Sequence, residues 1–103
     1  MGYASLELTN KVAVVIGGTS GIGRAIARAM AEAGADVVPT SRRMDQVEAT
    51  ALEIEERGRR TLRVTSDVVD SQSLQSLLDE TVAAFGKVDI LVNCAGRTKR
   101  APT

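Results

Sequence analysis

Apolar residues follow two different periods along this chain, and the changes of period mark its elements. Five consecutive apolar residues, Val12 to Ile16, form a run typical of a strand that is buried on both faces. A helical pattern follows a few residues later, with apolar side chains three and four positions apart at Ile22, Ala25, Ile26, Ala29, Met30 and Ala33. A glycine-rich turn at 17–23 joins the two, so the chain opens with strand, glycine turn and helix, and Gly34 ends that helix.

Two more helical patterns follow, and each ends at a glycine. The apolar positions of the first are Met44, Val47, Ala51 and Ile54, and those of the second are Leu74, Leu77, Leu78, Val82 and Phe85. Gly58 closes the first helix and Gly86 closes the second, while Asp70 or Ser71 can cap the start of the second.

Short apolar segments between these helices predict three further strands, at 36–38, 61–66 and 88–92. We expect Pro39 to end the second strand, because proline has no N–H to donate to a neighbouring strand. The order is then β-α-β-α-β-α-β. Such alternation favours an α/β fold, in which helices cover both faces of a doubly wound parallel sheet.

Length and composition exclude several classes of protein. A chain of 103 residues forms one domain at most, and 13 basic residues balance 13 acidic ones, which argues against a nucleic-acid partner. No apolar run approaches the roughly 20 residues that span a bilayer, and the N-terminus does not resemble a secretory signal. A single cysteine, Cys94, fits a reducing cytoplasm, and the absence of histidine excludes a histidine-based triad or zinc site.

The glycine turn offers the most specific chemistry. A helix N-terminus presents unpaired N–H groups and a partial positive charge, and glycines let a pyrophosphate approach the backbone. The spacing Gly17-x-x-x-Gly21-x-Gly23 resembles that of the short-chain dehydrogenase/reductase family, although Ile16 stands where that family usually has threonine. The resemblance implies a Rossmann sheet and these cofactor-binding residues in the turn: Gly17, Thr19, Ser20, Gly21, Ile22 and Gly23. The alternative is a strand-to-helix turn that binds no ligand.

Two later segments also match the family. Asn93-Cys94-Ala95-Gly96 resembles its Asn-Asn-Ala-Gly signature, which implies that Asn93, Ala95 and Gly96 lie beside the cofactor. We interpret Cys94 as a small buried residue rather than a nucleophile, since no histidine can act as its base. By the same resemblance, Asp67 accepts a hydrogen bond from adenine and Val68 lies beside the ring. The alternative for Asp67 is that it only caps a turn.

The residues after the second strand indicate which dinucleotide is bound. An acidic residue there would favour the ribose 2′-hydroxyl of NAD(H), but this chain has Ser41 and Arg42, which can bind a 2′-phosphate. The pair resembles that of NADP-preferring members, so we favour NADP(H), with NAD(H) still possible. Ser20 stands where some of those members carry a second basic residue. A solvated basic helix start is the alternative.

The catalytic half of the family's pattern is absent from the sequence. The resemblance implies a catalytic Tyr-x-x-x-Lys pair, but the single tyrosine, Tyr3, has Glu7 four positions later. No residue can therefore be given the acid/base role. We interpret residues 1–103 as the N-terminal part of a Rossmann domain, with strand order 3-2-1-4 and an exposed fourth strand at the edge. On its own it is expected to be weakly stable and prone to aggregate.

The resemblance implies an oxidoreductase that transfers a hydride between NADP(H) and a carbonyl or alcohol. Among its members the chain looks closest to 3-oxoacyl-carrier-protein reductases or to sugar and polyol dehydrogenases. It also implies a homotetramer or dimer, a small-molecule substrate and no membrane or nucleic-acid partner. A dinucleotide-binding module without catalytic activity is the alternative.

Overall fold

The computed structural model describes residues 7–95, which fold as a Rossmann-like α/β domain. The elements in chain order are β1 (Val12–Ile16), α1 (Gly21–Glu32), β2 (Asp36–Thr40), α2 (Met44–Glu56), α3 (Ser71–Phe85) and β3 (Ile90–Asn93). All three predicted helices are confirmed, with ends within about two residues of those expected from the glycines. No helix in this part of the chain is both long and apolar enough to cross a membrane.

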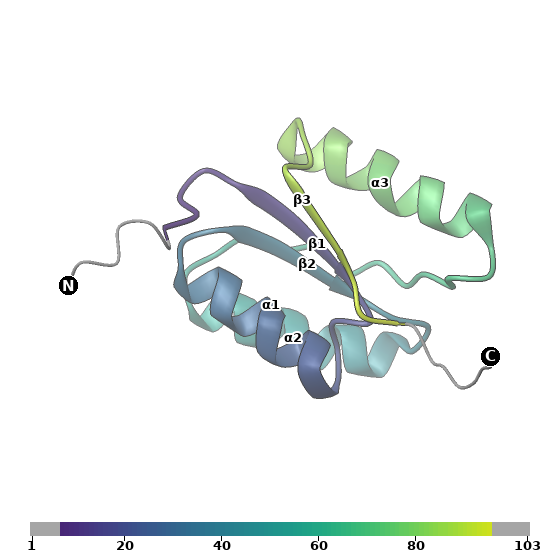
Figure 1. The fold of residues 1–103 in the computed structure, drawn as a ribbon, viewed down its shortest axis with the longest axis horizontal. Helices are drawn as coiled ribbons and strands as arrows, with labels where there is room; N and C mark the ends of the chain where they lie inside the picture. Colours follow the sequence, from purple (N-terminus) through teal and green to yellow (C-terminus); the bar gives the residue numbers. More distant parts are fainter. Residues whose placement is uncertain (1–6, 96–103) are drawn as a thin grey trace.

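The sheet has three parallel strands in the order β2-β1-β3 (Figure 1). Val14 of β1 lies opposite Val38 of β2 and Leu91 of β3. Helices α1 and α2 cover one face of the sheet and α3 covers the other (Figure 1). The central position of β1 explains its uninterrupted apolar sequence, because all five residues are buried.

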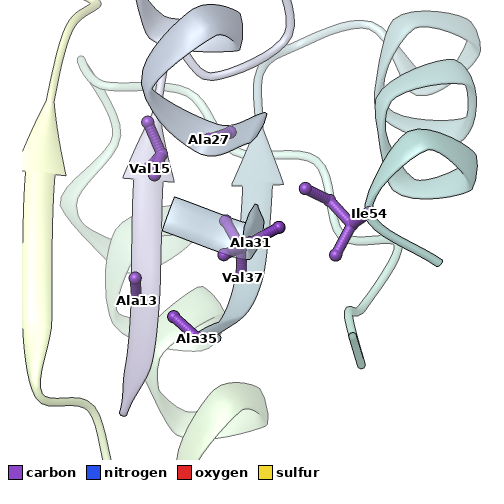
Figure 2. Packing of buried hydrophobic residues seen from close by; sticks show 7 residues of the cluster. All are labelled: Ala13, Val15, Ala27, Ala31, Ala35, Val37 and Ile54. Carbon is purple, nitrogen blue, oxygen red and sulfur yellow. The ribbon is translucent and has the colours of Figure 1, made fainter. Parts of the chain in front are cut away.

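Alternate residues of β1 point into two separate cores. Figure 2 shows the first, in which Ala13 and Val15 pack against α1, α2 and β2; its buried members are Ala13, Val15, Ala27, Ala31, Ala35, Val37 and Ile54. On the opposite face, Val14 and Ile16 pack with Val38 and with Leu77 of α3. Both cores hold β1 rigidly, and the loop that follows it is the glycine turn.

The fully buried residues of helix α1 are its smallest ones, while Met30, from the apolar pattern that predicted the helix, packs partly buried against the core. Gly23, Ala27 and Ala31 are its buried residues, whereas Ile22 is 77% exposed. Small side chains let the helix axis approach the sheet closely, and this spacing keeps the glycine turn compact. The apolar pattern thus predicted the helix but not the face that it buries.

The strand predicted at 61–66 is not formed, and this prediction was wrong. The segment runs beside β2 and is joined to it at two separated points, where Val37 N–H donates to Arg60 O and Ser66 N–H donates to Ser41 O. Both bonds fit one parallel register, with position 37 opposite 61 and position 41 opposite 65, but the backbone bonds that would complete the ladder between them are missing. Between these points the Thr40 hydroxyl, rather than a backbone N–H, donates to Val64 O.

Pro39 explains much of this irregularity. The N–H groups of Asp36 and Val37 point to opposite sides of β2, because the first donates to Lys11 O beside β1 and the second to Arg60 O. By alternation, position 39 faces the 61–66 segment, where a proline has no proton to donate. Pro39 was also wrongly predicted to end β2, since the strand continues to Thr40 and pairs with β1 throughout.

Candidate cofactor site

An open pocket of about 430 Å³ lies where the carboxyl ends of β1, β2 and β3 meet. This is the edge at which open α/β sheets bind ligands. Its lining comes from four segments far apart in the sequence: Ile16, Gly17, Ser41, Arg42, Ser66, Asp67, Val68, Val69 and Ala95. Six of these residues were expected from the sequence to bind a cofactor, and the structure brings them together.

Gly17 and Gly23 pack the turn against neighbouring backbone, whereas Gly21 leaves it open. Gly17 has a φ of +76°, and a Cβ on it would lie 2.7 Å from the backbone nitrogen of Ala95. A Cβ on Gly23 would lie 2.0 Å from the carbonyl oxygen of Gly17. Gly21 has a φ of +54°, and a Cβ on it would have no neighbouring atom within 4 Å. The turn is therefore locked against the sheet and α1, and is accessible at Gly21.

The start of α1 offers backbone donors that no side chain occupies. Ser20 is the N-cap residue, but its hydroxyl makes no capping hydrogen bond, and the first turn contains no acidic residue. Ile22, the second residue of the helix, is largely exposed beside these N–H groups. An uncapped N-terminus next to a glycine turn is suited to an anion.

The loop after β2 supplies a positive charge. Within residues 7–95, Arg42 makes no ion pair, although it lines the pocket with Ser41. Its neighbour Arg43 pairs instead with Asp45, with 3.1 Å between guanidinium nitrogen and carboxylate oxygen. Other arginines of this part of the chain are also paired with carboxylates, namely Arg24, Arg57, Arg60 and Arg63. Arg42 is thus available to an anionic ligand.

Thr19 links the glycine turn to this loop. Its side chain is 4% exposed, and its hydroxyl oxygen lies 2.9 Å from Ser41 Oγ and 3.2 Å from Gln46 Oε1. Thr19 does not line the pocket. The structure therefore places this predicted cofactor ligand behind Ser41, where it can act on the site through hydrogen bonds.

The 66–69 segment forms the wall opposite the glycine turn. Asp67 Oδ1 accepts from Val69 N–H at 3.1 Å, so its carboxylate does cap a turn, which was the alternative considered for it. Its other oxygen, Oδ2, makes no hydrogen bond within residues 7–95 and belongs to a residue that lines the pocket. Val68 and Val69 are 42% and 86% exposed and add apolar surface. A contact between Asp67 and adenine stays a prediction.

The end of β3 closes the pocket beside Gly17. Asn93 Oδ1 accepts from Ala95 N–H at 3.0 Å, and Cys94 N–H donates to Ile16 O at 2.7 Å. These bonds position Ala95 at the pocket. Cys94 is partly rather than fully buried, and it packs against the core on the α1 side of the sheet. The predicted ligand Gly96 lies outside the described residues.

Sequence reasoning missed three lining residues, Ile16, Ser66 and Val69. Each directly adjoins a residue that was predicted, and this adjacency in the sequence was the available signal. Ser66 is 5% exposed, and its hydroxyl oxygen lies within hydrogen-bonding distance of Thr40 Oγ1, at 3.0 Å. This bond holds the 66–69 segment against the end of β2.

The site combines an unpaired guanidinium and an apolar wall, which line the pocket, with the uncapped start of α1 at the end of the glycine turn. These properties suit a ligand that has both anionic groups and a flat apolar ring. Among residues 7–95, no group of three or more histidine, cysteine, aspartate or glutamate side chains is arranged to hold a metal ion.

Comparison with known proteins identifies the family. A family model described as short chain dehydrogenase matches residues 11–103. The chain belongs to this family. The match contains every segment that forms the pocket, so the resemblance seen in the glycine turn and near Asn93 is confirmed.

Individual relatives of the chain support the same family assignment. The chain is 45% identical over 92 residues to an uncharacterised oxidoreductase of Mycobacterium tuberculosis, covering 89% of this chain and 35% of that protein. It is 38% identical over 96 residues to 2-dehydro-3-deoxy-D-gluconate 5-dehydrogenase of Dickeya dadantii, covering 93% and 37%. The crystal structure of hydroxysteroid dehydrogenase from Escherichia coli superposes with a TM-score of 0.87 at 37% identity, covering 91% and 40%. The chain thus spans well under half the length of these relatives.

Proposed function

We propose that this chain supplies the cofactor site of an NADP(H)-dependent oxidoreductase that interconverts a carbonyl and an alcohol. Arg42 carries the proposal of NADP(H) over NAD(H): it lies beside Ser41 in the pocket and has no carboxylate partner within residues 7–95. A 2′-phosphate would give its guanidinium a charged partner.

The start of α1 and the 67–69 wall of the pocket support the same ligand. The uncapped start of α1 and the open space at Gly21 would accept a pyrophosphate. Adenine would lie on the apolar surface of Val68 and Val69 and donate to Asp67 Oδ2, which makes no hydrogen bond within residues 7–95. When bound, the reduced nicotinamide would supply a hydride to the substrate carbonyl. This chain's residues would bind and orient the cofactor, and we assign none of them to proton transfer.

A second candidate is a module that binds the dinucleotide without turning it over. This candidate needs no Tyr-x-x-x-Lys pair, and within these 103 residues the single tyrosine, Tyr3, has Glu7 four positions later. Oxidation of NADPH in the presence of carbonyl substrates, measured on the whole protein that contains this chain, separates the two candidates. Turnover supports the oxidoreductase, whereas tight binding with no turnover supports the module.

Replacement of Arg42 tests the proposed cofactor preference. Hydrogen bonds to charged groups contribute about 1.5–3 kcal/mol, so Arg42→Ala should raise the Kd for NADPH roughly 10- to 150-fold and change that for NADH much less. Arg42→Asp should go further and make NADH the tighter ligand, because a carboxylate repels a 2′-phosphate and accepts from a 2′-hydroxyl.

Arg43→Ala is the matched control. Arg43 adjoins Arg42 but pairs with Asp45, and its loss should leave the ratio of the two dissociation constants nearly unchanged. Fluorescence of the bound reduced nicotinamide gives both constants. An unchanged ratio in Arg42→Asp would contradict the role given to Arg42.

A further inference from the structure

Three polar side chains from three segments form a hydrogen-bonded group that reaches the pocket at one end. Thr19 comes from the glycine turn, Ser41 from the loop after β2 and Gln46 from the first turn of α2. Thr19 Oγ1 is the centre, 2.9 Å from Ser41 Oγ and 3.2 Å from Gln46 Oε1. Only Ser41 lines the pocket. Gln46 is therefore connected to the ligand site through a single buried hydroxyl.

The number of protons in this group limits what Ser41 can do. Thr19 has one hydroxyl proton and two polar neighbours, so it can donate fully to only one of them. When Thr19 donates to Gln46 Oε1, Ser41 satisfies it by donating its own proton to Thr19. Ser41 then faces the pocket with lone pairs only. Arg43 N–H, 3.4 Å from Ser41 Oγ, adds a weak donor to this oxygen and removes none of its protons.

A half-turn of the Gln46 amide reverses both hydrogen bonds. The amide has an acceptor end, Oε1, and a donor end, Nε2. If Nε2 donates to Thr19, the Thr19 proton is released to Ser41, and the Ser41 proton is then free to point into the pocket. The same three residues can thus present either an acceptor or a donor to the ligand.

We propose that Gln46 is a positioning residue for cofactor specificity: acting through Thr19, its amide decides whether Ser41 offers the ligand a donor or an acceptor. This inference rests on the proposed function, because the ligand group concerned is the 2′ substituent of the adenosine ribose. A 2′-phosphate can only accept, so it needs the donor state of Ser41. A 2′-hydroxyl can use either state.

Glutamate at position 46 would remove one of the two states. A carboxylate only accepts, so Thr19 must donate to it and Ser41 must donate to Thr19. Ser41 would then present lone pairs to the phosphate oxygens. Methionine at this position has a similar length but no strong hydrogen-bonding group, and it leaves Thr19 free to donate to Ser41.

The test is a double-mutant cycle on the purified protein. Dissociation constants for NADPH and NADH are measured for Gln46→Glu and Gln46→Met, each alone and combined with Thr19→Val. We expect Gln46→Glu to lower the preference for NADPH about fivefold or more, since it removes a hydrogen bond to a charged group. Gln46→Met should leave that preference within about twofold. In the Thr19→Val background, Gln46→Glu should leave the preference for NADPH over NADH almost unchanged.

The outcomes separate hydrogen bonding from simple charge repulsion. An equal effect of Gln46→Glu with and without Thr19 would overturn the proposal, and so would an unchanged preference in Gln46→Glu alone. Should Thr19→Val not fold, the comparison of Gln46→Glu with Gln46→Met is repeated in 1 M salt, where the Debye length is about 3 Å. An effect carried by hydrogen bonds persists there, whereas disappearance of the effect contradicts the proposal.

Failure of the proposed function would look different. A wild-type protein that binds neither dinucleotide overturns the proposed function and this inference together. A wild-type protein that binds NADPH normally, with a preference insensitive to Gln46→Glu, overturns only the inference. Thr19→Ser keeps the hydroxyl. In the Thr19→Ser background, Gln46→Glu should therefore lower the preference for NADPH as it does in the wild type.

Discussion

Asp89 stands just before β3 and makes three contacts, two of which are to Val12 at the start of β1. Its Oδ2 accepts from Val12 N–H at 2.8 Å and lies 3.1 Å from the Lys87 ammonium, while its own N–H donates to Val12 O at 2.8 Å. The Val12 N–H, and next the Lys87 ammonium, hold the pKa of the Asp89 carboxyl below its usual value. The charged form of Asp89 is therefore the one that the folded chain favours.

This shift predicts a pH-dependent contribution to stability. Because the pKa is lower in the folded chain than in the unfolded one, the contribution is fully present above the unfolded value of about 3.9 and is lost as the pH falls below it. Asp89→Asn removes this titration. The difference in Tm between wild type and Asp89→Asn should be largest near pH 7 and should shrink at pH 3.

Thermal unfolding followed by circular dichroism at both pH values checks this. Asp79→Asn is the control, because the Asp79 carboxylate lies on the surface of α3 and bonds only Gln75 within residues 7–95. It should change Tm little at either pH. A difference between wild type and Asp89→Asn that grows as the pH falls would contradict the prediction.

Helices α1 and α3 differ in whether a side chain bonds the free N–H groups at their N-termini. We relate a capped N-terminus to stability and an uncapped one to ligand binding. Helix α3 begins at a side-chain cap, since Asp70 Oδ1 accepts from Gln72 N–H at 3.0 Å and from Ser73 N–H at 3.4 Å. It ends at Gly86, whose φ of +87° is the left-handed conformation that glycine adopts freely. Helix α1 has no such cap at Ser20. The cap of α3 serves the fold, and the open end of α1 is available to a ligand.

Replacing each N-cap residue by alanine should show that only the cap of α3 contributes to stability. Asp70→Ala should lower the free energy of unfolding by about 1 kcal/mol, the usual contribution of an N-cap. Ser20→Ala should lower it much less, because the hydroxyl of Ser20 makes no capping bond. Urea unfolding gives both values. Equal losses in the two variants would contradict the assignment of a stabilising cap to Asp70 alone.

At the scale of the whole molecule, the three layers leave one strand edge unpaired among the described residues. β3 pairs with β1 on one side only. Ile90 and Val92 pack toward the α1 core, while Leu91 points to the α3 face and is 53% exposed, because α3 packs over β1 and β2 instead. An apolar edge strand of this kind invites pairing with another chain.

We therefore expect the 103-residue chain to self-associate through β3. Leu91→Lys should reduce the oligomeric fraction in sedimentation velocity, because a charge on an edge strand opposes pairing. Val69→Lys is the control, since Val69 is 86% exposed but lies at the cofactor pocket. A wild-type chain that stays monomeric over a wide concentration range would be evidence against this expectation.

Local sequence patterns predicted every observed helix and strand and the glycine turn that joins β1 to α1. Periodicity, capping residues and glycines act over a few neighbouring positions, so they located all three helices and, to within about two residues, the three observed strands. They narrowed the cap of α3 to Asp70 or Ser71, and the structure uses Asp70. The spacing of Gly17, Gly21 and Gly23 led to the family. The adjacency of Ser41 and Arg42 likewise led to the proposed dinucleotide.

How distant segments meet became visible only in the folded chain. It showed that Pro39 faces the 61–66 segment, which prevents a regular ladder there, and that α1 buries Gly23 rather than Ile22. It also paired Arg43 but not Arg42, and turned Thr19 toward Ser41. These outcomes depend on distances and directions between residues far apart in the sequence. A local pattern carries no information about them until the chain has folded.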